Sequence, residues 1–152
     1  MSLLLEAFAS GSIQVGVSLT SRDEAISLAG QLLVDSGRVH QSYIQEMLSA
    51  IEEYGPYIVI APGIALAHGR PSDLVIANGM SVVVLSEPIV FGSERNDPVS
   101  LVFGLAATGH DEHLEFMAAL AEALSTTSFV NSLLNAEDSE QIRLLLASPL
   151  GQ

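Results

Sequence analysis

The chain has 152 residues, 49% of them hydrophobic, which suits one domain that buries roughly 70% of the surface its unfolded chain exposes. It has no cysteine, which excludes disulfides, thiolate nucleophiles and thiolate metal ligands. Its net charge of −13, from 18 acidic residues against 5 basic ones, argues against binding to nucleic acid or to an anionic membrane and favours a basic protein partner.

The chain shows no internal repeat and no linker rich in proline, glycine or serine, so we expect a single domain over residues 1–152. No basic segment precedes the first apolar residues, and the longest apolar runs are only as long as a strand. We therefore expect no export signal and no membrane insertion. With the lack of cysteine, these features favour a cytoplasmic protein.

The N-terminal part predicts one strand and two helices. Apolar residues alternate over residues 13–19, which is the period of a strand. Ser21 and Glu24 have the spacing of a capping box, and the helix that begins there is expected to end at Gly37. A second helix is predicted over residues 41–54, where a Gly-Pro pair stops it.

The middle of the chain then changes period, and the candidate strands are residues 57–61, 64–67, 80–85, 89–91 and 99–106. Asn78-Gly79 is a strong turn signal, and we expect it to form a hairpin. Helices are predicted again over 112–125, 129–134 and 139–147. The elements predict an α/β layered sandwich in which a central mixed sheet of about five strands is flanked by helices. Neither a glycine-rich phosphate loop nor a dinucleotide fingerprint is present.

His68 has the surroundings that best suit chemistry. It ends an apolar strand and is followed by Gly69-Arg70-Pro71, so the sheet fixes its backbone while its imidazole can face solvent. Gly69 allows a close approach of backbone amides, and Arg70 offers a bidentate fork to phosphate. The same local pattern also fits a strand-end histidine that bonds a neighbouring loop. His40, between the first two helices, is expected to be a solvated or capping residue.

A second cluster, His110-Asp111-Glu112-His113, follows the last strand and falls where a helix begins. Free amides and the positive end of a helix attract anions there. Two histidines three apart also share a helix face, so His110 and His113 with a carboxylate could bind zinc. A third interpretation is that Asp111 caps the helix and the histidines are surface residues. Like His68, the cluster lies at a strand end, where open α/β sheets usually build ligand sites.

The stretch from Gly55 to Pro71, Gly-Pro-Tyr-Ile-Val-Ile-Ala-Pro-Gly-Ile-Ala-Leu-Ala-His-Gly-Arg-Pro, resembles the active-site segment of a known family. The family is the enzyme IIA component of the bacterial phosphoenolpyruvate-dependent sugar phosphotransferase system, mannitol/fructose type (type 2). The ending histidine, small residue, Arg-Pro is most similar to the ascorbate-specific branch. The likeness covers nearly the whole chain and includes residues 22–38, Tyr43, Met47, 99–107, His113-Leu114, 129–134 and 140–142.

The resemblance implies a phosphohistidine relay. The histidine-containing phosphocarrier protein would donate a phosphoryl group to His68, with Nε2 as the attacking atom, and a cysteine of a cognate IIB component would remove it. His113 would stabilise the phosphoryl oxygens and Arg70 would contact them. The relay requires no cofactor and no metal, and the sugar would be ascorbate or a related one. The resemblance leaves the oligomeric state open, a homodimer included.

Two departures from the family pattern stand out. The family usually has proline before the phosphorylated histidine, and Ala67 stands there, which is expected to loosen the loop slightly. Mannitol-type members carry an arginine after the methionine of the second helix, whereas Ser49-Ala50-Ile51 has none, and Arg70 is expected to take over its phosphate contact.

Three alternatives remain open at this point. A regulatory, nitrogen-type phosphocarrier of the same fold would use the same histidine to signal by protein contact. A metal-dependent hydrolase would use His110, His113 and an acidic residue. A non-catalytic relative would have lost the activity.

Overall fold

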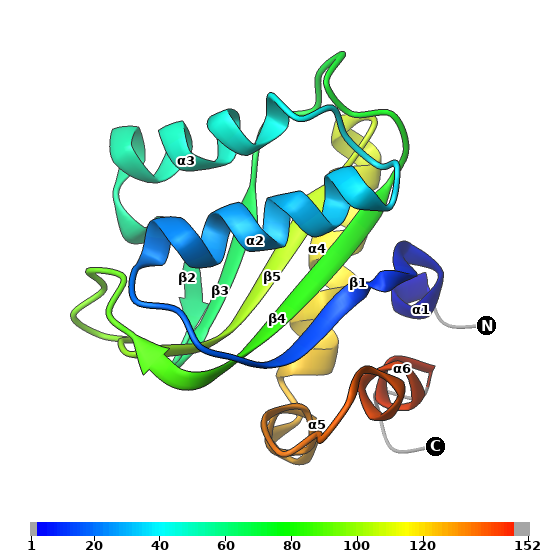
Figure 1. The fold of residues 1–152 in the computed structure, drawn as a ribbon. Helices are drawn as coiled ribbons and strands as arrows, with labels where there is room; N and C mark the ends of the chain where they lie inside the picture. Colours follow the sequence, from blue (N-terminus) through cyan, green and yellow to red (C-terminus); the bar gives the residue numbers. More distant parts are fainter. Residues whose placement is uncertain (1–2, 148–152) are drawn as a thin grey trace.

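The computed structural model describes residues 3–147, apart from the side chains of residues 3 and 9–11. In chain order the elements are α1 (Leu3–Ala7), β1 (Phe8–Val17), α2 (Arg22–Asp35), α3 (Tyr43–Tyr54), the 3-10 turn η1 (Pro56–Ile58), β2 (Val59–Ala61), β3 (Ile64–His68), β4 (Gly79–Ile89), β5 (Val99–Ala106), α4 (His110–Leu124), α5 (Thr127–Leu134) and α6 (Ser139–Ala147). Figure 1 shows their arrangement.

The five strands form one sheet in the order β1-β4-β5-β3-β2. β1 pairs with β4 and β3 with β5 in parallel, whereas β4 with β5 and β2 with β3 are antiparallel, so the predicted mixed sheet is confirmed. The hairpin predicted at Asn78-Gly79 is wrong, because β5 lies between β3 and β4. Asn78 instead joins two loops, since its side-chain oxygen accepts bonds from the backbone N–H and the hydroxyl of Thr108.

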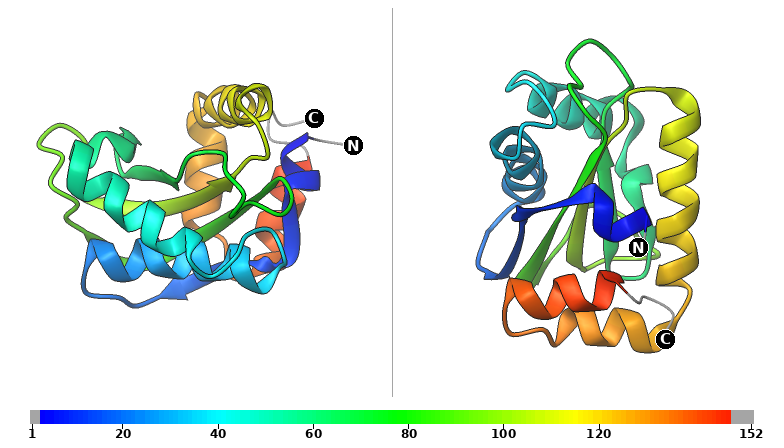
Figure 2. Two further views of the ribbon diagram at one scale, coloured as in Figure 1. Left: turned by 90° about the horizontal axis from the view of Figure 1, so that it is seen from above. Right: turned by 90° about the vertical axis from the view of Figure 1, so that its right-hand side faces the viewer.

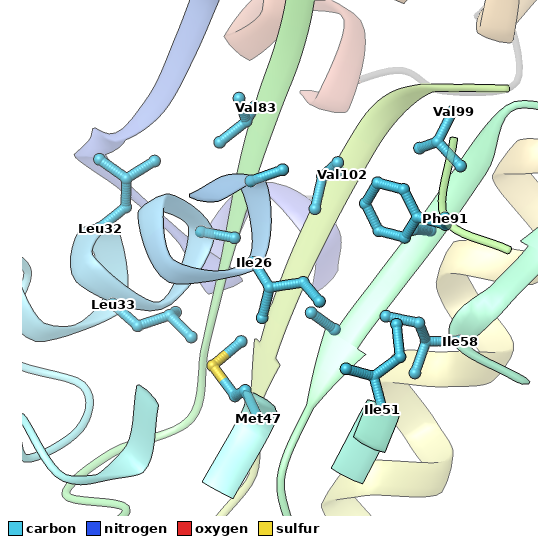
Figure 3. Close-up of a cluster of buried hydrophobic side chains, with 14 of the residues drawn as sticks. Ile26, Leu32, Leu33, Met47, Ile51, Ile58, Val83, Phe91, Val99 and Val102 are labelled. Carbon is cyan, nitrogen blue, oxygen red and sulfur yellow. The ribbon is translucent and has the colours of Figure 1, made fainter. Parts of the chain in front are cut away.

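The sheet is the middle of three layers. α2 and α3 cover one face, α4 covers the other, and α5 and α6 lie at the end of the α4 side (Figures 1 and 2). Side chains alternate across each strand, which divides the core in two. Figure 3 shows part of the cluster between the sheet and the helices α2 and α3, which includes Ile26, Leu33, Met47, Ile51, Val83 and Val102. The opposite cluster includes Ile64, Leu66, Leu101, Phe103, Leu105, Phe116 and Leu120.

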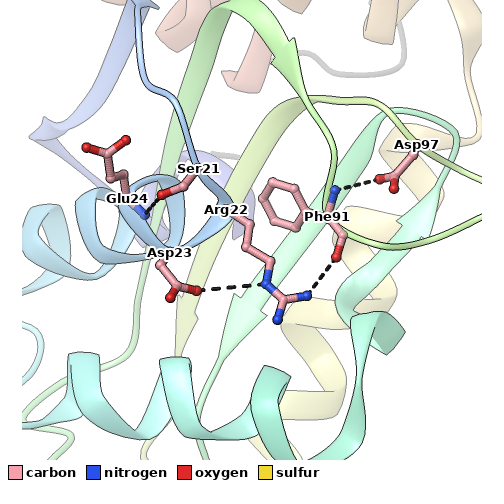
Figure 4. A network of polar contacts seen from close by, with 6 residues as sticks. All are labelled: Ser21, Arg22, Asp23, Glu24, Phe91 and Asp97. Atoms are coloured by element: carbon pink, nitrogen blue, oxygen red, sulfur yellow. Dashed lines mark hydrogen bonds and ion pairs between the residues drawn. The ribbon is translucent and has the colours of Figure 1, made fainter.

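The start of α2 is fixed by polar contacts (Figure 4). Ser21 is the N-cap, and its hydroxyl accepts a bond from the N–H of Glu24 at 3.2 Å. The Glu24 carboxylate accepts from the backbone N–H and the hydroxyl of Thr20, so it binds one residue before the cap. Arg22 donates to the carbonyl oxygen of Phe91 at 2.9 Å. α2 is therefore tied to the loop between β4 and β5.

Most predicted elements are confirmed, with shifted ends. α6 has the predicted bounds, and α4 begins two residues earlier than predicted, at His110. The segments 80–85 and 89–91 were predicted apart because residues 86–88 are polar or proline, yet β4 runs through them as an exposed strand. α1 and η1 were not predicted. Across residues 3–147, no helix has the length and apolarity needed to span a membrane.

Candidate functional site

Parallel pairing brings His68 and the start of α4 to the same edge of the sheet. His68 is the last residue of β3 and pairs with Leu105 near the end of β5, and α4 begins shortly after β5. Ile64 and Leu66 pack on the α4 side of the sheet, so the strand alternation turns His68 to that side as well. The His68 and His113 rings meet there, with centroids 5.1 Å apart.

The backbone fixes the tautomer of His68. Its Nδ1 lies 3.1 Å from the carbonyl oxygen of Leu66. A carbonyl only accepts hydrogen bonds, so Nδ1 carries the hydrogen and Nε2 keeps its lone pair. The Leu66 carbonyl is available because β2 pairs only as far as Ala65, and the chain before β2 is the turn η1.

Burial lowers the pKa of His68 below its ordinary value, and the bond to the Leu66 carbonyl opposes this only in part. The pKa of His113 is also lowered, first by burial and then by the nearby His68 and His110. Both imidazoles are therefore neutral at pH 7. A neutral His68 with a free Nε2 has the form that a nucleophile requires.

A cleft of about 840 Å³ lies over these histidines. Its walls come from α3, from the loop after β3 and from the first turn of α4. Arg70, which is exposed, lines it and donates to the hydroxyl of Tyr54 at 3.0 Å. Tyr57 makes an edge contact with the His68 ring at a centroid distance of 5.9 Å. Among the described residues that line the cleft, Arg70 is the one arginine. The α3 wall presents Ser49 and Ala50 in the stretch where mannitol-type members carry an arginine.

The first turn of α4 borders the cleft. Gly109 is the N-cap and Asp111 lies inside the first turn of the helix, so the interpretation in which Asp111 caps the helix is wrong. His113 N–H makes a bond to Gly109 O, so the N–H groups of residues 110–112 precede the first intrahelical bond. His110 and His113 both line the cleft. The structure thus brings together His68, His110, His113 and Arg70, which the sequence had placed in two separate clusters.

Two further residues of α3 reach the site. Tyr43, named above only as part of the family likeness, is fully buried, and its hydroxyl contacts both Gly69 and Leu105. The only signal in the sequence is general, since a buried tyrosine must find partners for its hydroxyl. Glu46 also lines the cleft, and its buried Oε2 has no hydrogen-bond partner among the described residues.

Ala67 and His40 differ from the other singled-out residues. Ala67 is not in a loop, because it is buried in β3 and pairs with Gly104, so regular strand structure continues up to His68. His40 is exposed and lies outside the cleft lining. Within residues 3–147, no group of three histidine, aspartate or glutamate side chains is placed to hold a metal ion. In that part of the chain, the hydrolase alternative lacks a ligand set.

Comparison with known proteins assigns the family. Residues 6–148 match the family described as phosphoenolpyruvate-dependent sugar phosphotransferase system, EIIA 2. The chain belongs to this family, as the resemblance of its active-site segment implied, and it is thus a component of a sugar phosphotransferase system.

Individual relatives are similar to the chain in sequence and in fold. The ascorbate-specific EIIA component of Salmonella choleraesuis is 39% identical over 104 residues, which is 68% of each chain. The mannitol-specific cryptic enzyme IIA CmtB of Escherichia coli has a TM-score of 0.85 at 31% identity, covering 95% of this chain and 99% of that one. Enzyme IIA in the complex of the mannitol IIA with phosphorylated IIB from Escherichia coli has a TM-score of 0.81 at 29% identity, covering 92% and 96%.

Proposed function

We propose that this chain is a phosphohistidine carrier in which His68 accepts a phosphoryl group from the histidine-containing phosphocarrier protein and passes it to a cysteine of a IIB component. The observation that carries the proposal is the state of His68. Its imidazole lies in a cleft, its Nδ1 is bound to the Leu66 carbonyl, and its Nε2 is free to attack.

The transfer step needs one nucleophile and no proton acceptor. The Nε2 lone pair attacks phosphorus, the N–P bond of the donor's phosphohistidine breaks, and a new N–P bond forms on His68. The positive charge that develops on the imidazole is stabilised by the Leu66 carbonyl at Nδ1–H. In the second step the IIB thiolate attacks phosphorus, and His68 leaves as the neutral imidazole. Such steps depend mainly on in-line positioning and on charge stabilisation.

The other site residues supply hydrogen-bond donors to the phosphoryl oxygens. His113 lies beside His68 and is the nearest ring donor. The free amides at the start of α4 and the guanidinium of Arg70 share the negative charge. Arg70 binds Tyr54 in the unphosphorylated protein, so it would exchange this contact for the phosphoryl group. In this role it replaces the arginine that α3 lacks.

The wider assignment rests on the relatives. The ascorbate-specific relative supports ascorbate or a related sugar as the transported substrate, and the Escherichia coli complex supports a IIB partner. The family match supports one type-2 enzyme IIA domain over residues 1–152 that works in the cytoplasm.

Phosphate transfer tests the proposal directly. The protein is incubated with phosphoenolpyruvate, enzyme I and the histidine phosphocarrier, and an acid-labile, alkali-stable mass increase is mapped by peptide. We expect the label at His68, none in His68→Ala, slower labelling in His113→Ala and unchanged labelling in His40→Ala, which alters a remote exposed histidine. Labelling of His68→Ala at the wild-type rate would refute the assignment. Onward transfer to a IIB cysteine distinguishes transport from a purely regulatory carrier.

A further inference from the structure

The hydrogen-bond ladder between β3 and β5 is interrupted one step after His68. Ile64 pairs with Leu101, whose N–H makes a bond to the carbonyl of Gly63. In a parallel pair, a residue bonded in this way also accepts from the residue that follows its partner, and every second residue repeats the pattern. Leu105 pairs with His68, so its carbonyl is directed at the N–H of Gly69.

A tyrosine hydroxyl occupies this position instead of a direct bond. Tyr43 Oη accepts the Gly69 N–H at 2.8 Å and lies 2.9 Å from the carbonyl oxygen of Leu105. A second carbonyl, that of Gly69, lies farther away at 3.3 Å. The hydroxyl has one hydrogen, so the shorter contact marks Leu105 as the acceptor. The next ladder bond is thus replaced by a bridge through Tyr43 Oη.

The surroundings hold the bridge in place. Tyr43 is fully buried, and burial raises the pKa of its hydroxyl to about 12, so it stays a donor at physiological pH. Gly69 leaves room for the ring, because a Cβ there would lie 3.0 Å from Tyr43 Cε1. Helix α3, which carries Tyr43, also forms a wall of the cleft.

We propose that Tyr43 is a positioning residue for His68: its hydroxyl, inserted between Gly69 and Leu105, holds β3 apart from β5 directly after His68. The separation keeps the loop with Arg70 on the α3 side and leaves the His68 ring in contact with His113. This inference rests on the proposed phosphocarrier function of His68. Tyr43 is buried, so it acts through the backbone of Gly69 and makes no contact with the donor protein.

The test compares Tyr43→Phe with a matched control, Ser81→Ala. Each removes one buried hydroxyl that donates to a backbone carbonyl, and Ser81 binds Ala29 away from the cleft. For Tyr43→Phe we expect the kcat of phosphoryl acceptance to fall roughly 10- to 100-fold, the scale of small misplacements at a reacting group, with KM for the donor protein within about twofold. Ser81→Ala should keep the wild-type kcat.

An NMR measurement adds a readout that a loss of stability alone would not change. Long-range ¹⁵N–¹H spectra of the folded variant should show a changed tautomer ratio or titration midpoint for His68. A Tyr43→Phe protein with the wild-type kcat, or one slowed no more than Ser81→Ala, overturns the inference. If Tyr43→Phe does not fold, Gly69→Ala replaces it, because its Cβ would lie 3.0 Å and 3.2 Å from ring carbons of Tyr43 and so strains the packing between Gly69 and the same side chain. The same outcomes apply.

The two proposals fail in different ways. If the wild-type protein takes no label at His68 from an active donor, the phosphocarrier function is refuted. If the wild-type protein is labelled and the Tyr43→Phe protein performs equally well, only the role of Tyr43 is refuted.

Discussion

Replacing Gly69 by alanine tests how closely α3 packs against the residue after His68. The added Cβ would lie 3.0 Å and 3.2 Å from ring carbons of Tyr43 and 3.1 Å from Oε2 of Glu46. The Tyr43 ring is buried and its hydroxyl is held by two backbone groups, so it has little room to withdraw. Overpacking costs about 1–3 kcal/mol, and the lower chain entropy of unfolded alanine offsets about 0.4–1 kcal/mol.

We therefore expect the free energy of unfolding to fall by roughly 1–2 kcal/mol, which lowers Tm by about 2–8 °C in a domain of this size. Thermal and urea unfolding measure the change. Adding Glu46→Ala to Gly69→Ala should restore little stability, because the carboxylate ends a flexible side chain and the Tyr43 ring is the rigid obstacle. Wild-type stability in Gly69→Ala, or full recovery in the double variant, would refute the packing against Tyr43.

Three further outcomes follow from local contacts. Ser21→Ala removes the N-cap of α2 and should lower the free energy of unfolding by about 1 kcal/mol, measured by urea unfolding. Because burial lowers the folded-state pKa of His68 and His113, the unfolded chain takes up protons first as pH falls, so stability should decline below roughly pH 6.5, and less so in His68→Gln. At alkaline pH stability should instead decline as pH rises. Burial raises the pKa of the Tyr43 hydroxyl from its ordinary 10.0 to about 12, so the unfolded chain loses this proton first. Stability should fall by roughly 2–3 kcal/mol between pH 10 and 12, and less in Tyr43→Phe. The chain has neither lysine nor cysteine, so few other side chains titrate in this window.

The sequence predicted the helices and most strands because their signals are local. The capping serine before α2 and the regular apolar spacing of α6 depend only on neighbouring residues. The hairpin at Asn78-Gly79 failed because turn chemistry does not decide which strands pair. β4 and β5 are buried on both faces for most of their length, so they occupy the centre of the sheet, and β3 pairs with β5.

The site was predictable in part for the same reason. His68 and the cluster at His110 each lie at a strand end, which sequence alone reveals. Their meeting depends on the parallel pairing of β3 with β5 and on the alternation that turns His68 toward α4. The bridge through Tyr43 depends on a register of single residues, so no pattern of apolar spacing could have predicted it.

The charges in the cleft suit a carrier that must also release its cargo. A phosphoryl group on His68 brings nearly two negative charges into a protein whose net charge is already −13. Before transfer, burial keeps the pKa of His113 low, so in the proposed mechanism the incoming group meets a neutral imidazole, the amide donors at the start of α4 and one guanidinium, that of Arg70. Hydrogen bonds from neutral donors orient the phosphoryl oxygens without cancelling their charge. In the proposed mechanism the phosphoryl group would therefore meet one cationic side chain among the described residues that line the cleft, Arg70, and this limited charge compensation would favour transfer to the next nucleophile.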